Sequence, residues 1–89
     1  MQEKQITIIN KLGLHARAAA KLINVTSQFS ADIQLIKDGR KVDGKSIMSV
    51  MMLAASKGTD LTVTTDGEDE QQAITAIEAL INNRFDEEE

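Results

Sequence analysis

The chain has 89 residues, a single histidine and no cysteine. This length fits one domain with a modest core, and the absence of cysteine excludes disulfides and cysteine-ligated metals. One histidine is also too few for a histidine-rich zinc site, so we expect neither a metal nor another cofactor.

The formal net charge of -4 is unevenly distributed along the chain. Residues 1–65 carry nine basic and five acidic side chains, whereas residues 66–89 carry one basic and nine acidic. There is no dense basic cluster and there are only two aromatic residues, so the sequence does not favour nucleic acid as a partner. No apolar stretch approaches the ~20 residues that cross a bilayer, and no secretory leader is recognisable, so we expect a cytoplasmic protein without membrane insertion.

The first half of the chain predicts a strand, a helix and a β-hairpin. Residues 5–9 alternate and are rich in β-formers, and residues 10–13 are typical of a loop. Apolar residues then recur at helical spacing from Ala16 to Phe29, which predicts a helix of about three turns. Residues 32–37 alternate again, and Asp38-Gly39 is a hairpin turn leading into a short strand at 40–42.

The second half predicts two further helices around a fourth strand. Ser46 suits the N-cap of a short helix over 47–55, which Lys57-Gly58 would end. Residues 61–65 predict the fourth strand, and the acidic residues 68–70 suit the first turn of a last helix that Phe85 closes.

The resulting order, β-α-β-β-α-β-α, predicts an α+β fold with a largely antiparallel four-stranded sheet and three helices on one face. We expect one domain over residues 1–85. The acidic residues 86–89 are expected to form a solvated tail.

His15 lies where the first strand has ended and a helix is about to begin. A helix start offers unpaired backbone N–H groups and favours an anion, and Arg17 adds donors suited to phosphate. Imidazole is partly neutral and nucleophilic near pH 7, so this arrangement suits phosphoryl transfer. It suits acyl transfer less, because no nearby serine or cysteine and no orienting aspartate are present. Spacing alone favours an ordinary capping or exposed histidine, with Arg17 and Lys21 as surface charges.

The short helix over 47–55 is too apolar for a single buried stripe. Three of its residues can face the core, and three others then form an exposed ridge. The core set is Val50, Leu53 and Ala54, and the ridge is Ile47, Met48 and Met51. Methionine recurs at surfaces that bind several partners. The pattern alone does not separate a docking ridge from methionines that fill the core.

Two stretches resemble motifs of the HPr family, the phosphocarriers of the bacterial phosphotransferase system. Gly13-Leu14-His15-Ala16-Arg17 resembles the phosphohistidine motif. The stretch from Gly39 through Lys45-Ser46-Ile47-Met48-Ser49-Val50-Met51-Met52-Leu53-Ala54 resembles the serine-site motif, and the separation of the two also matches. Ala18 stands where the family usually has proline, and Leu12 where sugar-transport members often have a small polar residue. The run Asn10-Lys11-Leu12-Gly13 and the ending Phe85-Asp86-Glu87 look closer to NPr, the nitrogen-branch relative, and to similar Gram-negative carriers.

The resemblance implies an HPr-like open-faced β-sandwich and a phosphoryl carrier rather than an enzyme. His15 would accept a phosphoryl group on Nδ1 from the phosphoenolpyruvate-dependent first enzyme of the system and pass it to an EIIA-type acceptor. Arg17 and the backbone of Ala16, Arg17 and Ala18 would hold the phosphate. We expect the carrier to be a monomer.

The resemblance also implies a regulatory site, with Ser46 as the candidate substrate of an HPr kinase/phosphorylase. Partners would dock beside the histidine and the serine. The docking set is Lys21, Lys45, Ile47, Met48 and Met51. The alternative is a regulatory binding module that acts mainly through Ser46 phosphorylation.

Overall fold

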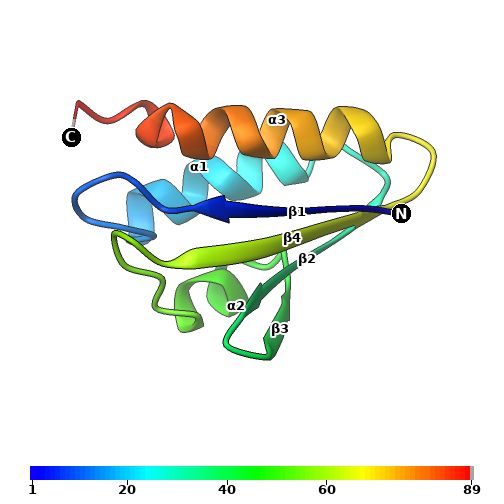
Figure 1. The fold of residues 1–89 in the computed structure, drawn as a ribbon. Helices are drawn as coiled ribbons and strands as arrows, with labels where there is room; N and C mark the ends of the chain where they lie inside the picture. Colours follow the sequence, from blue (N-terminus) through cyan, green and yellow to red (C-terminus); the bar gives the residue numbers. More distant parts are fainter. Residues whose placement is uncertain (89) are drawn as a thin grey trace.

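The computed structural model of the chain describes residues 1–88. Its elements follow in the order β1 (Gln2–Thr7), α1 (Ala16–Thr26), β2 (Asp32–Lys37), β3 (Arg40–Asp43), α2 (Ile47–Met52), β4 (Asp60–Asp66), α3 (Glu70–Asn82) and the 3₁₀ turn η1 (Arg84–Asp86). The strands form one antiparallel sheet in the order β1-β4-β2-β3 (Figure 1).

The sheet is apolar on one face because side chains alternate along each strand. The register pairs Ile6 with Leu61 across β1 and β4, and Val63 with Leu35 across β4 and β2. All four side chains are buried. The central strands therefore present one continuous apolar surface, against which the helices can pack.

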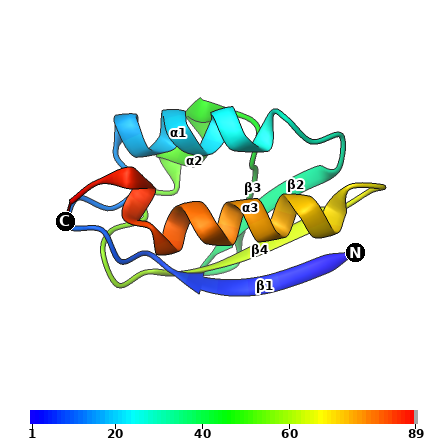
Figure 2. The same cartoon turned by 90° about the horizontal axis from the view of Figure 1, so that it is seen from above.

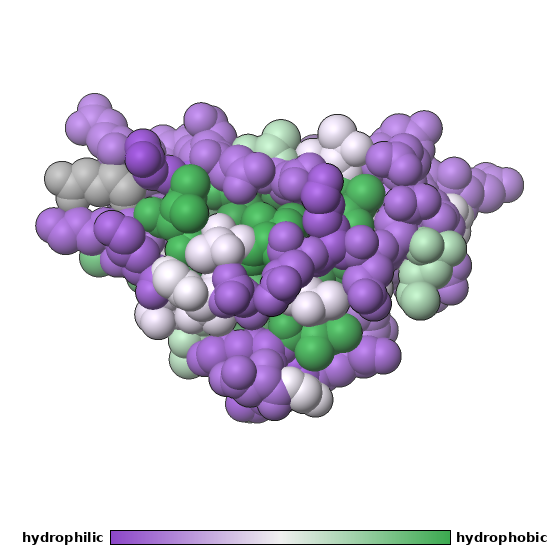
Figure 3. Space-filling view, viewed as in Figure 1, coloured by the Kyte–Doolittle hydropathy of each residue, from purple (hydrophilic) through white to green (hydrophobic). Residues whose placement is uncertain are grey.

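The helices bury this apolar surface. α1 and α3 run side by side over the sheet, and α2 packs against α1 and β3 (Figures 1 and 2). Each helix contributes to a single core, α1 through Leu22, α2 through Val50 and α3 through Ile77. Hydrophilic residues dominate the outer surface in the first view, with small hydrophobic patches between them (Figure 3). The predicted α+β fold, with an antiparallel sheet and three helices on one face, is confirmed.

The prediction for the end of α2 was wrong. The helix stops at Met52 instead of continuing to residue 55, and Ala54 is exposed with a φ of 53°. Just after the helix, the N–H groups of Leu53 and Ala54 donate to carbonyls three residues back, those of Val50 and Met51. These bonds tighten the last turn. The chain then turns so that the carbonyl of Ala55 accepts a hydrogen bond from Leu14 N–H at 2.8 Å. This long-range contact with the loop before α1 sets where α2 ends.

The start of α3 also differs from the prediction. Only Glu70 lies in its first turn, and Asp69 is the N-cap residue. The Asp69 carboxylate accepts backbone hydrogen bonds from Ser30 at 2.8 Å and Ala31 at 2.9 Å, which ties the loop after α1 to the start of α3. These bonds, of which the one from Ser30 contributes most, lower the pKa of the Asp69 carboxyl.

Within residues 1–88, no helix is long and apolar enough to cross a membrane.

Asp69→Asn is expected to lower the stability at neutral pH and to weaken its dependence on acid. Because the folded-state pKa of Asp69 lies below its ordinary value, the ionised group stabilises the fold above that ordinary value. This contribution is lost as the pH falls through the lowered pKa. Urea unfolding at about pH 7 and about pH 3 should show that the difference in unfolding free energy between wild type and variant is smaller in acid. Glu68→Gln, an exposed neighbour, is the charge-matched control. An equal gap at both pH values would contradict the prediction.

Candidate functional site

His15 is the N-cap residue of α1, at the end of a loop whose backbone is fixed by hydrogen bonds. Gly13 N–H donates to Asn10 O at 3.2 Å, and the Asn10 side-chain amide returns a bond to Gly13 O at 2.8 Å. Leu14 N–H is held by Ala55 O, as described above. Gly13 has a φ of 68°, which favours glycine. These bonds therefore fix the position of His15 at the start of α1.

The start of α1 presents backbone donors that the helix does not use. The first helical bond runs from Ala19 N–H to His15 O at 2.8 Å. Among residues 1–88, the N–H groups of Ala16, Arg17 and Ala18 make no such bond, and the His15 side chain does not cap them. Ala16 and Arg17 are exposed, whereas Ala18 is fully buried. The accessible donors of the predicted phosphate cradle are therefore those of Ala16 and Arg17.

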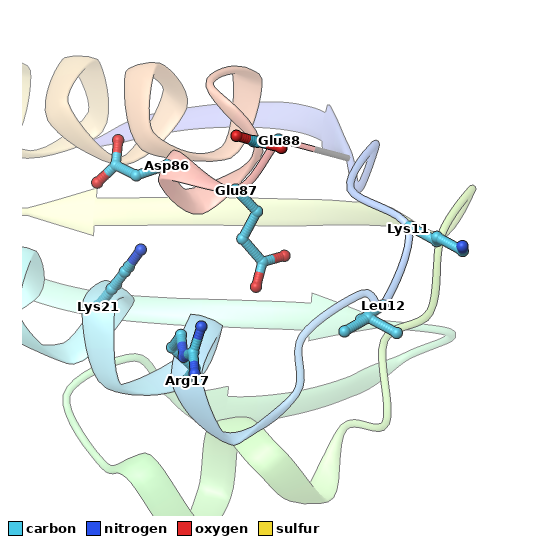
Figure 4. A pocket seen from close by; sticks show the side chains of 7 residues that line it. All are labelled: Lys11, Leu12, Arg17, Lys21, Asp86, Glu87 and Glu88. Atoms are coloured by element: carbon cyan, nitrogen blue, oxygen red, sulfur yellow. The ribbon is translucent and has the colours of Figure 1, made fainter.

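An open hollow of about 510 Å³ lies between α1, the loop before it and the C-terminal segment. Figure 4 shows Arg17 and Lys21 of α1 on one side, with the Glu87 carboxylate reaching toward them from the other. The full lining is Lys11, Leu12, Arg17, Lys21, Asp86, Glu87 and Glu88. His15 itself does not line the hollow. Glu87 connects the two, because its carboxylate bonds to His15 and also lines the hollow.

The C-terminal segment departs from the predicted solvated tail at Glu87, although Asp86 and Glu88 are exposed. Glu87 Oε2 lies 2.5 Å from His15 Nε2, and Oε1 accepts a hydrogen bond from Asn10 Nδ2 at 2.9 Å. The bond from Asn10, followed by that from His15, lowers the pKa of the Glu87 carboxyl. Asp86 belongs to η1. Of the predicted tail, only Glu89 lies outside the described residues.

The course of the tail is set by one buried aromatic ring and by an unusual backbone. Phe85 is fully buried, and its carbonyl accepts a hydrogen bond from Lys21 Nζ at 2.8 Å. Arg84, Phe85 and Asp86 have φ values of 55°, 52° and 62°. Left-handed conformations cost on the order of 1 kcal/mol or more for residues other than glycine, and they persist only where tertiary contacts fix them. The tail is therefore directed back onto the His15 loop.

Sequence reasoning did not identify Asn10 and Glu87 as members of the site. Glu87 is 72 residues from His15, and no local pattern encodes a contact over that distance. The available hint was Phe85, the only aromatic residue after Phe29, standing in an otherwise polar ending. A lone aromatic residue there indicates an anchor that draws its neighbours onto the domain.

Ser46 is the N-cap residue of α2, as predicted, and its hydroxyl accepts a hydrogen bond from Ser49 N–H at 3.3 Å. Lys45 does not pair with it, because Lys45 Nζ donates to Phe29 O at 2.7 Å. Ser46 is half-buried, and its hydroxyl is used by the helix as a cap.

The apolar ridge on α2 is exposed, as predicted, and larger than expected. Met48 is 68% exposed, and Ile47 and Met51 are also at the surface. Met52, which the prediction did not include, is 59% exposed. Val50 and Leu53 of the predicted core set are buried. The methionines of α2 therefore do not fill the core.

Among residues 1–88, no group of three or more histidine, cysteine, aspartate or glutamate side chains could hold a metal ion. The site can instead bind an anion, because two open backbone donors and Arg17 surround the start of α1. Its one nucleophilic ring, that of His15, is 27% exposed. A partner protein could therefore reach it.

Comparison with known proteins points to one family. The family described as "PTS HPr component phosphorylation site" matches residues 2–83. The phosphocarrier protein HPr of Cupriavidus necator is 55% identical over 87 residues, and that of Pseudomonas aeruginosa 56% identical over 88, with 98% of each chain covered in both cases. The crystal structure of HPr from Thermoanaerobacter tengcongensis superposes with a TM-score of 0.97 at 45% identity, over the whole of both chains.

Proposed function

Because the chain belongs to the HPr family of phosphocarriers of the phosphotransferase system, we propose that His15 carries its phosphoryl group. The observation that supports this role is the position of His15 as N-cap of α1, beside open backbone donors and the exposed Arg17. Phosphoryl transfer needs mainly positioning and neutralisation of charge, and both are present at this helix start. The protein acts as a carrier and not as a catalyst, in the cytoplasm.

The relay has two symmetrical steps. The lone pair of His15 Nδ1 attacks the phosphorus of the phosphorylated first enzyme, and the bond from phosphorus to that donor breaks with its electron pair. The phosphoryl oxygens then lie against the N–H groups at the start of α1 and the Arg17 guanidinium. In the second step a nucleophile of an EIIA-type acceptor attacks the same phosphorus, and His15 leaves.

The exposed ridge of α2 is the docking surface that we propose for both partners. Its methionines can adapt to two different surfaces. The ammonium groups of Lys21 and Lys45 are bound to main-chain carbonyls, so these side chains contribute positive field more than direct contact. Such a field favours encounter with an acidic partner surface.

Ser46 is the proposed regulatory site. A phosphate on an N-cap serine meets the positive end of its helix, so the modification leaves α2 folded. It adds negative charge beside the ridge, where it repels an acidic partner. Phosphorylation of Ser46 would therefore control the docking of partners. The same chemistry also fits the alternative function, a regulatory binding module that acts mainly through phosphoserine.

One labelling experiment tests these roles. Incubation with the first enzyme and phosphoenolpyruvate should place an acid-labile phosphate on the wild-type chain and none on His15→Ala. Incubation with an HPr kinase and ATP should give an acid-stable, alkali-labile phosphate that Ser46→Ala loses and His15→Ala keeps. If only the second label forms, the regulatory module is correct and the carrier role is wrong.

A further inference from the structure

We propose that Glu87 is a positioning residue for His15, whose carboxylate holds the ring hydrogen on Nε2 and so leaves the Nδ1 lone pair free for phosphorus. This inference rests on the proposed carrier role of His15. It concerns the C-terminal segment, to which the sequence assigned no part in the site.

The contact belongs to a chain of three side chains with fixed orientations. Glu87 bonds His15 Nε2 through Oε2 and Asn10 Nδ2 through Oε1. The fully buried Asn10 directs its amide nitrogen to Gly13 O as well. A flipped amide would place Asn10 Oδ1 against two oxygen acceptors, so the orientation is determined. Asn10 Oδ1 has no hydrogen-bond partner among residues 1–88.

The chemistry of the contact determines the tautomer of His15. An ionised carboxylate can only accept hydrogen bonds, so the ring nitrogen that faces it must carry hydrogen. A neutral imidazole has only one N–H, and the other nitrogen, Nδ1, then holds the free lone pair. The bond from Asn10 and the nearby charge of Lys21 both keep the Glu87 carboxyl ionised by lowering its pKa.

The same contact stabilises the phosphorylated form. When Nδ1 bonds to phosphorus and the donor bond breaks, the ring still carries hydrogen on Nε2 and becomes positively charged. The charge develops against the Glu87 carboxylate, which favours it. No proton has to leave during the transfer.

Glu87 also lines the hollow beside Arg17, so its negative charge could instead repel the incoming phosphoryl group. The two roles predict opposite signs. A positioning carboxylate makes phosphorylation slower when it is neutralised, and a repelling one makes it faster. Glu88→Gln is the matched control, because Glu88 lines the same hollow but makes no hydrogen bond to His15 within residues 1–88.

The test uses the full chain with ¹⁵N-labelled histidine, unphosphorylated, at about pH 9 where imidazole is neutral. The two ring nitrogen shifts report the tautomer. We expect the Nε2–H form to dominate in the wild type and in Glu88→Gln, and its ratio to the Nδ1–H form to fall about tenfold in Glu87→Gln, as a charge-assisted bond becomes a neutral one. Amide spectra of the same samples report whether each variant is folded.

The rate of phosphorylation by the first enzyme supplies the second measurement. Glu87→Gln should be slower by about tenfold, with Glu88→Gln closer to the wild type. An unchanged tautomer ratio in Glu87→Gln, or faster phosphorylation of that variant, would overturn the positioning role. If the wild-type chain takes up no phosphate, the proposed carrier function is wrong. The tautomer ratio can still be measured in that case, so the two failures are distinguishable.

Discussion

Phe85→Ala is expected to lower the free energy of unfolding by about 3–5 kcal/mol and to detach the C-terminal segment from His15. Phe85 is fully buried and is the largest such side chain in the described part of the protein. Its ring is the anchor that precedes Glu87. Without the ring, the remaining contacts do not offset the free-energy cost of the left-handed backbone at residues 84–86. The C-terminal segment should then detach from the domain.

Urea unfolding measures the stability, and ¹⁵N spectra of His15 measure the detachment. Ile81→Ala is the control, because Ile81 is a fully buried residue of α3 that precedes η1. It should lose about 2–5 kcal/mol yet keep the His15 spectrum of the wild type, with the fold intact. A Phe85→Ala protein with an unchanged His15 spectrum would show that the anchor is not needed for the contact.

Gly13→Ala is expected to cost about 3 kcal/mol of unfolding free energy, from two separate causes. The φ of 68° disfavours any residue with a Cβ. The added Cβ would also lie 2.6 Å from Ala55 O and 2.8 Å from Ser56 Cα. Both are backbone atoms, so no side-chain rotation can relieve the overlap. The loop that carries His15 must shift instead, and the bond from Leu14 N–H to Ala55 O should weaken.

Gly39→Ala separates the two causes. Gly39 has a φ of 81°, but an added Cβ there would meet nothing within 4 Å. Its substitution should therefore cost only the backbone term, about 1 kcal/mol. Comparison of the two variants by urea unfolding isolates the overlap at Gly13. Equal losses would contradict a role for close approach between the His15 loop and residues 55–56.

The sequence was informative where structure depends on near neighbours. Alternation and helical spacing predicted the strands and helices, because each element buries its own apolar face. His15 at a helix start and Ser46 as an N-cap were predicted for the same reason, since capping involves residues within one turn. The excess of apolar residues in α2 over what a single stripe can bury left two interpretations open, an exposed ridge or methionines that fill the core, and only the structure decided for the ridge.

Only the tertiary structure decided the features that depend on distant parts of the chain. α2 ends at Met52 because the next residues must meet the loop before α1, which its own composition does not encode. Glu87 reaches His15 because Phe85 enters a core built by all the other elements. An acidic ending alone is typical of a solvated tail, and the free energy that overrides this preference comes from burial and hydrogen bonds 72 residues away.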